Sequence, residues 1–150
     1  MRLVIQRVSK ASVTVDQEVV GEINLGLLVL VGLGRDDTRA NLEKASKKLL
    51  ELRIFADDQH KFQFSALDLK AEILLVPQFT LYADTSKGRR PEFFSAMPPA
   101  EAQAAFNQFV EIVSQNTPAK VATGSFGAYM QVQLLNDGPV TICLNDQDLS

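Results

Sequence analysis

A nearly continuous apolar run, from Leu27 to Val31 in the stretch GLLVLVG, leaves this chain few ways to fold. Because the run is apolar on both faces, a strand formed by it must be covered on both sides, as a central strand of a sheet is. The alternating segment RLVIQRVSKASVTVD and the segment QEVVGEIN predict two further strands before it. We therefore expect the first third of the chain to be rich in strands.

Two helices are expected after these strands. Thr38 can cap the first helix, and the pair Pro98-Pro99 opens the second. Apolar residues recur at helical spacing in both: Leu42, Ala45, Leu49 and Leu52 in the first, and Phe106, Phe109, Val110 and Val113 in the second. These faces predict two helices packed on the sheet.

The remaining segments complete the expected order of elements. Residues 55–70 are polar and turn-rich, which predicts a loop with at most a short strand around Phe62 to Phe64. AEILLVP predicts a buried strand broken at Pro77, and the closing segment returns to strands. This order predicts the α+β class, with a mostly antiparallel sheet and a single domain over residues 1–150.

Composition excludes several classes of protein. An apolar fraction of 46% and a charged fraction of 22% are ordinary for a globular chain, and no apolar run is long enough to span a bilayer. With Cys143 as its one cysteine, the chain has no internal disulfide, which suits the cytoplasm. Cys143 and the single histidine, His60, make no zinc-type cluster, so no metal or cofactor is expected.

The usual residues of hydrolytic catalysis are missing. His60 lies in a charged loop without a serine or cysteine partner nearby, so it is interpreted as a solvated loop residue. Cys143 lies in an apolar strand and is interpreted as a small buried side chain rather than a nucleophile. The sequence also lacks a nucleophile-elbow, phosphate-loop or dinucleotide motif.

The segment PQFTL, residues 77–81, is the first candidate site. We expect a strand with Gln78 and Thr80 on one face and Phe79 on the other. Pro77 interrupts the ladder, so the amides of Phe79 and Thr80 can be unpaired and can stabilise an oxyanion. Thr80 as a nucleophile needs an activating base, and none is predicted near it. The alternative is a buried strand whose polar side chains bond neighbouring backbone.

Two more segments carry candidate residues. KGRRP holds Lys87, Arg89 and Arg90, which can bind phosphates or can form a solvated loop. Because the net charge is −3, phosphate contacts must come from such a local patch. In QVQLLNDGPVTICL we expect two strands joined by a turn at residues 136–138, with Pro139 placed where the returning strand should donate a hydrogen bond. Its X-Pro bond can be cis or trans.

Together, PQFTL, KGRRP and TGSFGAYMQVQLLNDGPVT, with the opening MRLVIQRVSKASVTVD, resemble the D-aminoacyl-tRNA deacylases over nearly the whole chain. The resemblance implies a homodimer of a small, barrel-like α+β fold. It also implies hydrolysis of the ester between a D-amino acid and the tRNA 3′-terminal ribose, and removal of glycine mischarged on tRNA(Ala). One departure is Pro77, where the commonest family motif has serine.

The resemblance also implies roles for particular residues. Gln78, Phe79 and Thr80 would hold the ester and stabilise the oxyanion, largely through main chain, with the ribose hydroxyl of the tRNA assisting. A cis Gly138-Pro139 pair would reach into the partner subunit's site and exclude L-amino acids. Arg7, Asn136 and Thr141 would support this pair. The basic segment would bind tRNA through Lys87, Arg89 and Arg90.

Two other functions are compatible with the sequence. One is a non-catalytic tRNA- or RNA-binding domain that uses the basic segment. The other is an editing domain of the same fold, as in some archaeal threonyl-tRNA synthetases, although those domains belong to longer chains. We expect a cytoplasmic enzyme with no membrane or DNA partner.

Overall fold

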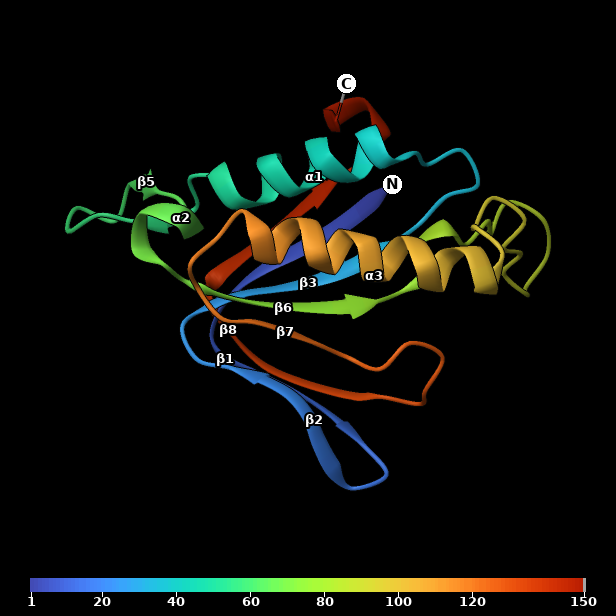
Figure 1. Ribbon diagram of the computed structural model, residues 1–150, viewed down its shortest axis with the longest axis horizontal. Coiled ribbons are helices and arrows are strands. Elements are labelled where there is room, and N and C mark those ends of the chain that lie inside the picture. Colours follow the sequence, from blue (N-terminus) through green and yellow to red (C-terminus); the bar gives the residue numbers. More distant parts are fainter. Residues whose placement is uncertain (150) are drawn as a thin grey trace.

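A computed structural model describes residues 1–149, and in it strands from both ends of the chain share one sheet (Figure 1). The order across the sheet is β2-β1-β3-β6-β7, with β8 paired to β1. The strands have these bounds: β1 Arg2–Val15, β2 Glu18–Ile23, β3 Gly26–Gly32, β6 Glu72–Pro77, β7 Val121–Thr123 and β8 Gln131–Leu144. Strand β3 is therefore central, as its apolar run predicts.

The sheet is mixed. Strand β1 is antiparallel to β2, β3 and β8, whereas β3–β6 and β6–β7 are parallel pairs. The parallel pairs arise because helices connect their strands, and parallel strands need such crossovers. The expected α+β class with a barrel-like sheet is confirmed. Strand β2 approaches β7 so closely that a Cβ on Gly21 would lie 2.3 Å from the carbonyl oxygen of Thr123.

Two helices cover one face of the sheet, α1 (Arg39–Glu51) and α3 (Pro99–Gln115) (Figure 1). Both are confirmed, although α1 ends before Leu52, which is extended. Thr38 is the N-cap of α1, and its N–H donates to Asn41 Oδ1 at 2.8 Å. The main core lies between these helices and the sheet, and its larger members include Leu3, Ile5, Leu42, Leu49, Ile73, Leu75, Phe106 and Phe109.

A second apolar cluster fills the opposite side of the sheet. Its buried residues are Val8, Ala11, Val13, Ile23, Leu28, Leu74 and Val76. Strands β3 and β6 contribute to both clusters, so each is covered on both faces. None of the described helices is long and apolar enough to cross a membrane. The described residues also hold no group of three His, Cys, Asp or Glu side chains placed to bind a metal ion.

The polar segment between α1 and β6 contains more structure than expected. The short strand at Phe62–Phe64 (β5) is confirmed and pairs with β4 (Phe55–Ala56). A short helix follows, α2 (Ala66–Leu69), capped by Ser65. Hydrogen bonds from Ser65 lower the pKa of Asp68, which completes this cap. His60 is an exposed loop residue with φ of 61°, in line with its interpretation.

The interpretation of Cys143 as a buried side chain is wrong. Cys143 is exposed and lies opposite Val4 of β1. Side chains alternate between the two faces of a strand, and the neighbours of Val4 in β1, Leu3 and Ile5, point into the core beneath the helices. Val4 and Cys143 therefore face away from the core beneath the two helices that the structure describes, α1 and α3.

Candidate active site

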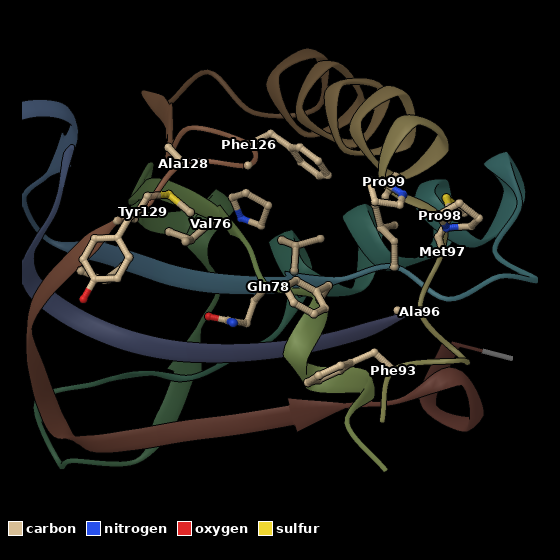
Figure 2. A pocket seen from close by; sticks show the side chains of 18 of the residues that line it. Val76, Gln78, Phe93, Ala96, Met97, Pro98, Pro99, Phe126, Ala128 and Tyr129 are labelled. Carbon is tan, nitrogen blue, oxygen red and sulfur yellow. The ribbon is translucent and has the colours of Figure 1, made fainter. Parts of the chain in front are cut away.

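A cavity of about 600 Å³ opens where β3 and β6 end. Figure 2 shows Gln78 near its centre, Phe126 and Tyr129 on one wall, and Phe93 and Met97 on the other. The first wall is the loop between β7 and β8, and the second is the segment that leads into α3. Most lining groups are apolar, which is typical of a pocket that binds an organic ligand with few polar contacts.

The expectation that PQFTL is a strand is wrong beyond Gln78. The Gln78 N–H donates to the Val31 carbonyl at 2.8 Å and adds one bond to the parallel ladder past Pro77. The chain then turns into a 3₁₀ helix, η1 (Phe79–Tyr82). Gln78 and Thr80 therefore do not share a strand face. They meet instead because the turn brings the Gln78 amide nitrogen to the Thr80 hydroxyl, to which it donates.

The start of η1 leaves two backbone donors free. The first N–H groups of a helix have no acceptor within it. Within residues 1–149, the N–H groups of Phe79 and Thr80 have no hydrogen-bond partner, whereas the N–H of Leu81 donates to Gln78 at 3.3 Å. These two donors follow each other along the backbone, and both Phe79 and the residue before it, Gln78, line the cavity. Their use in catalysis stays a prediction.

Contacts with distant residues hold η1 in place. The Phe79 ring is 58% exposed and packs edge-on against Phe93, with ring centroids 4.9 Å apart. At the other end, Arg2 donates from Nη1 to the Leu81 carbonyl at 2.7 Å and lies over the Tyr82 ring at 4.5 Å. The donors of η1 are therefore fixed by β1 on one side and by the wall of the cavity on the other.

The basic segment forms a loop beside the same cavity. Asp84 and Glu92 close it by exchanging two backbone hydrogen bonds, of 2.8 and 3.0 Å. Hydrogen bonds from Ser86 lower the pKa of Asp84. The three cations between these residues are exposed and form no described ion pair: Lys87, Arg89 and Arg90. The loop leads directly into Phe93, which lines the cavity. Contact of Lys87, Arg89 and Arg90 with tRNA stays a prediction.

The expected hairpin around Asn136 to Gly138 is wrong. Residues 131–144 form one strand, β8, and both of its halves pair with β1. Asn136 lies opposite Val8 and Thr141 opposite Gln6, so residues 137–140 bulge out opposite Arg7 alone. The sequence suggested a turn because Asn, Asp and Gly suit turns, but the chain continues past them in the same direction and stays paired with β1.

Arg7 fixes the bulge from one side. It is 9% exposed, and it donates from Nε to the Asp137 carbonyl at 3.0 Å and from Nη1 to the Ile54 carbonyl at 2.7 Å. Its Nε also lies 3.4 Å from the Asp137 carboxylate. Gly138 has φ of 134°, and a Cβ there would lie 2.9 Å from Arg7 Nη2. The Gly138-Pro139 peptide is cis.

Asn136 fixes the bulge from inside the strand. Its side chain donates to the Val140 carbonyl at 3.1 Å and accepts from the Val140 N–H at 2.9 Å. Thr141 adds a weaker contact, because its hydroxyl lies 3.4 Å from Asn136 Nδ2 and 3.3 Å from Gln6 Nε2. The three supporting residues of the sequence analysis therefore all contact or flank the bulge.

The structure does not bring the two predicted halves of the site together within one chain. Gly138 and Pro139 are exposed, and neither lines the cavity. The bulge lies opposite Arg7, which pairs with Leu27 near the start of β3, whereas the cavity begins at Val31. A single chain therefore offers a pocket with open donors and, well away from it, a rigid exposed bulge.

Sequence reasoning missed the walls of the cavity. The residues concerned are Phe126, Ala128, Tyr129 and Met130 on one side, and Ala96 to Pro99 on the other. One signal for them is present in the sequence. Large apolar residues occur in loop segments, in SFGAYM and in FFSAMPP, where they cannot join the core of a helix or strand.

Comparison with solved structures supports the fold first. The structure titled "Structural Analysis of a probable eukaryotic D-amino acid tRNA deacylase" aligns with a TM-score of 0.82 at 20% identity, over 95% of this chain and 97% of that one. A second, titled "c-Myc DNA Unwinding Element Binding Protein", aligns with a TM-score of 0.92 at 43% identity, over 97% and 99%. Both share the complete fold described above.

Curated relatives define the class. A D-aminoacyl-tRNA deacylase of Stenotrophomonas maltophilia (strain R551-3) is 54% identical over 96% of this chain and 99% of the relative. One from Thermosipho melanesiensis is 47% identical over 98% of both chains. The class is therefore that of the deacylases, which are hydrolases. The family model described as D-Tyr-tRNA(Tyr) deacylase matches residues 4–145, and the chain belongs to this family.

Proposed function

We propose that the protein hydrolyses the ester bond of D-aminoacyl-tRNA, releasing the D-amino acid and tRNA, and spares the L esters. The observation that carries the proposal is the pair of free N–H groups of Phe79 and Thr80 at the edge of an apolar cavity. Such donors stabilise the oxyanion that forms when water attacks an ester carbonyl. The ribose oxygen then leaves with a proton, which the neighbouring ribose hydroxyl helps to transfer.

Thr80 has no nucleophilic role in this proposal. Its hydroxyl accepts a hydrogen bond from the Gln78 amide, and no described base contacts it. A hydroxyl needs such a base to attack an ester at neutral pH. His60, the one histidine, lies in the loop between β4 and β5. Gln78 and Thr80 instead position the turn that presents the two donors.

For selection against L-amino acids, we propose that a second copy of the chain supplies the bulge. Gly138 and Pro139 are exposed and do not line the pocket of their own chain, and Arg7 and Asn136 hold them rigid. Placed over the partner's ester, such a wall excludes an L side chain and tolerates a D side chain. Glycine has no side chain to exclude, so glycine mischarged on tRNA(Ala) is also removed.

The test is hydrolysis of D-tyrosyl-tRNA and L-tyrosyl-tRNA, side by side, at neutral pH. We expect rapid loss of the D ester and persistence of the L ester. If neither ester is cleaved while tRNA still binds, a non-catalytic tRNA-binding role replaces the proposal, with Lys87, Arg89 and Arg90 as its contacts. If both esters are cleaved equally, the role given to Gly138 and Pro139 is wrong.

A mixing experiment tests the shared site. Phe79→Pro removes a donor from the pocket, and Pro139→Ala alters the bulge. If the bulge serves the partner's pocket, the mixed dimer of these two variants holds one site with both parts intact, and it regains D-selective hydrolysis that neither parent shows. If pocket and bulge act within one chain, every site keeps a defect and mixing restores nothing.

A further inference from the structure

Phe94 is a large aromatic residue that the fold leaves in solvent. Its side chain is 75% exposed, although Phe93 before it packs on Phe79 and Ala96 after it is buried. An exposed ring of this size adds little to the stability of the chain, because it buries little surface. Single exposed apolar residues are common, so exposure alone does not indicate a binding role. The position of Phe94 beside the cavity and the cations around it do.

The backbone that presents Phe94 is firmly held. Arg35 Nε donates to the Phe94 carbonyl, and the Arg35 N–H donates to the carbonyl of Ser95 at 3.2 Å. Met97 continues the attachment, because its N–H donates to the Leu33 carbonyl at 2.9 Å. The segment is therefore attached to the end of β3, and the ring of Phe94 is exposed on a rigid support rather than on a loose loop.

Positively charged residues belong to the segments on this side of the cavity. Arg35 lines the cavity, and the exposed residues Lys87, Arg89 and Arg90 precede Phe94 along the chain. On the opposite wall, Tyr129 is 89% exposed, but the sequence has no lysine or arginine after Lys120. A phosphate backbone that leaves the pocket is therefore attracted toward Phe94. Exposed aromatic rings next to such cations are typical of sites that bind single-stranded RNA.

We propose that Phe94 stacks on an unpaired base that directly precedes the terminal nucleotide of the substrate, while Arg35 and the basic loop contact the neighbouring phosphates. This inference rests on the proposed function, because it requires the ester-bearing nucleotide to reach Gln78. The nucleotides before it must then cross the rim of the cavity. Phe94 is thus a binding residue for the tRNA end, outside the groups that act on the ester.

The experiment compares two substrates with and without the ring. D-tyrosyl-tRNA carries the preceding nucleotides, and the D-tyrosyl ester of adenosine lacks them. For Phe94→Ala we expect KM for the tRNA to rise roughly 5- to 100-fold, as the loss of one base–aromatic stack predicts. We expect kcat on both substrates, and KM for the adenosine ester, to stay within about twofold of the wild type.

Two further variants separate stacking from structure. Phe94→Trp keeps an aromatic face and should retain the wild-type KM for tRNA. Leu25→Ala removes an apolar side chain that is 49% exposed, just before β3 and outside the lining of the cavity, and should leave KM and kcat unchanged for both substrates. Unfolding in urea and mass measurement in solution accompany each variant, so that a loss of folding or of dimer formation is recognised.

The outcomes separate this inference from the proposed function. An unchanged KM of Phe94→Ala for tRNA overturns the inference, as does an equal loss on both substrates, which would assign Phe94 to the pocket. A shift from dimer to monomer also overturns it, because the ring would then be covered by a second copy. If the wild type cleaves neither ester, the proposed function fails. The Kd for uncharged tRNA then tests Phe94 separately: a higher Kd for Phe94→Ala than for the wild type supports the stacking role, and equal Kd values overturn it.

Discussion

Two regions of the molecule, each next to a proline, differ in whether the polar groups of their backbone have hydrogen-bond partners. Just after Pro77 the chain leaves the sheet, and the next turn leaves the N–H groups of Phe79 and Thr80 without partners among residues 1–149. At Pro139 the chain bulges from β8, and side chains bond the backbone on both sides, Arg7 at Asp137 and Asn136 at Val140.

This difference indicates different uses. An unpaired donor costs free energy in the folded protein unless solvent or a ligand accepts its hydrogen bond, so two adjacent ones suit a place where an oxygen arrives. A backbone whose hydrogen bonds are made by its own side chains suits a surface that must keep its shape against a ligand. The first region therefore suits the proposed contact with an oxyanion, and the second suits the proposed exclusion of L side chains.

The largest expected effect comes from removing a donor at the first region. Phe79→Pro and Phe79→Ala both lose the ring, but only Phe79→Pro loses the N–H, at the first position of a helix, where proline is tolerated. We expect kcat for the D ester to be about 100- to 1,000-fold lower in Phe79→Pro than in Phe79→Ala. Equal kcat values, and equal rate constants in single-turnover assays, would show that this N–H takes no part.

At the second region, Arg7→Ala should destabilise the fold and release the bulge. It leaves the buried Ile54 carbonyl without its donor and removes the bond to Asp137. We expect the free energy of unfolding to fall by about 3 kcal/mol, since bonds from charged donors are among the stronger ones. Urea titration measures this, and Arg7→Lys, which keeps the charge, is the control. Intact stability together with intact D-selectivity would contradict the role given to Arg7.

Asn136→Ala should have a smaller effect at the same bulge. It removes one bond to the Val140 carbonyl and one from the Val140 N–H, worth about 1–2 kcal/mol together. Asn136→Asp keeps the acceptor for that N–H and loses the donor, so its loss of stability should fall between those of Asn136→Ala and the wild type. If the two variants unfold at the same urea concentration, the bond from the Val140 N–H adds nothing; if Asn136→Asp is as stable as the wild type, the bond to the carbonyl adds nothing.

The smallest effect concerns the loop beside the pocket. Hydrogen bonds from Ser86 lower the pKa of Asp84 in the folded protein. A lowered pKa contributes stability above the pKa of the unfolded chain, and this is lost as the pH falls through the folded value, below about pH 4. In Asp84→Asn, the free energy of unfolding should therefore fall less steeply as the pH is lowered below about 4. Urea titrations at several pH values measure this, and the same slope in Asp84→Asn and the wild type contradicts this account.

Local pattern predicted much of the fold. The apolar run before Gly32, the prolines before α3 and the break at Pro77 each act through nearby residues, and each element formed as expected. The bulge was missed for a physical reason. Asn136, Asp137 and Gly138 suit a hairpin turn, and only the pairing of both halves of β8 with β1 decides against one. That pairing joins residues more than a hundred positions apart.

In the candidate site, too, features signalled by neighbouring residues could be predicted, and contacts between distant positions could not. Gln78, Phe79 and Thr80 became candidates because a proline in an apolar strand is a local signal, but their roles rest on the resemblance and stay predictions, and the 3₁₀ turn was not foreseen. The contact of Arg7 with the bulge was implied only by resemblance, because no pattern links position 7 to position 137. Cys143 was misjudged because alternation along β8 does not say which of its faces the helices cover.

The bond from the Gln78 N–H to Val31 has a consequence for the motion of the site. It attaches the last residue before η1 to β3, whose residues lie in both apolar clusters. The Gln78 amide should then exchange its hydrogen with solvent only when the central sheet opens, while the amides of Phe79 and Thr80 exchange freely. We therefore expect a slowly exchanging amide next to two rapidly exchanging ones, on a turn whose first residue is attached to the central sheet.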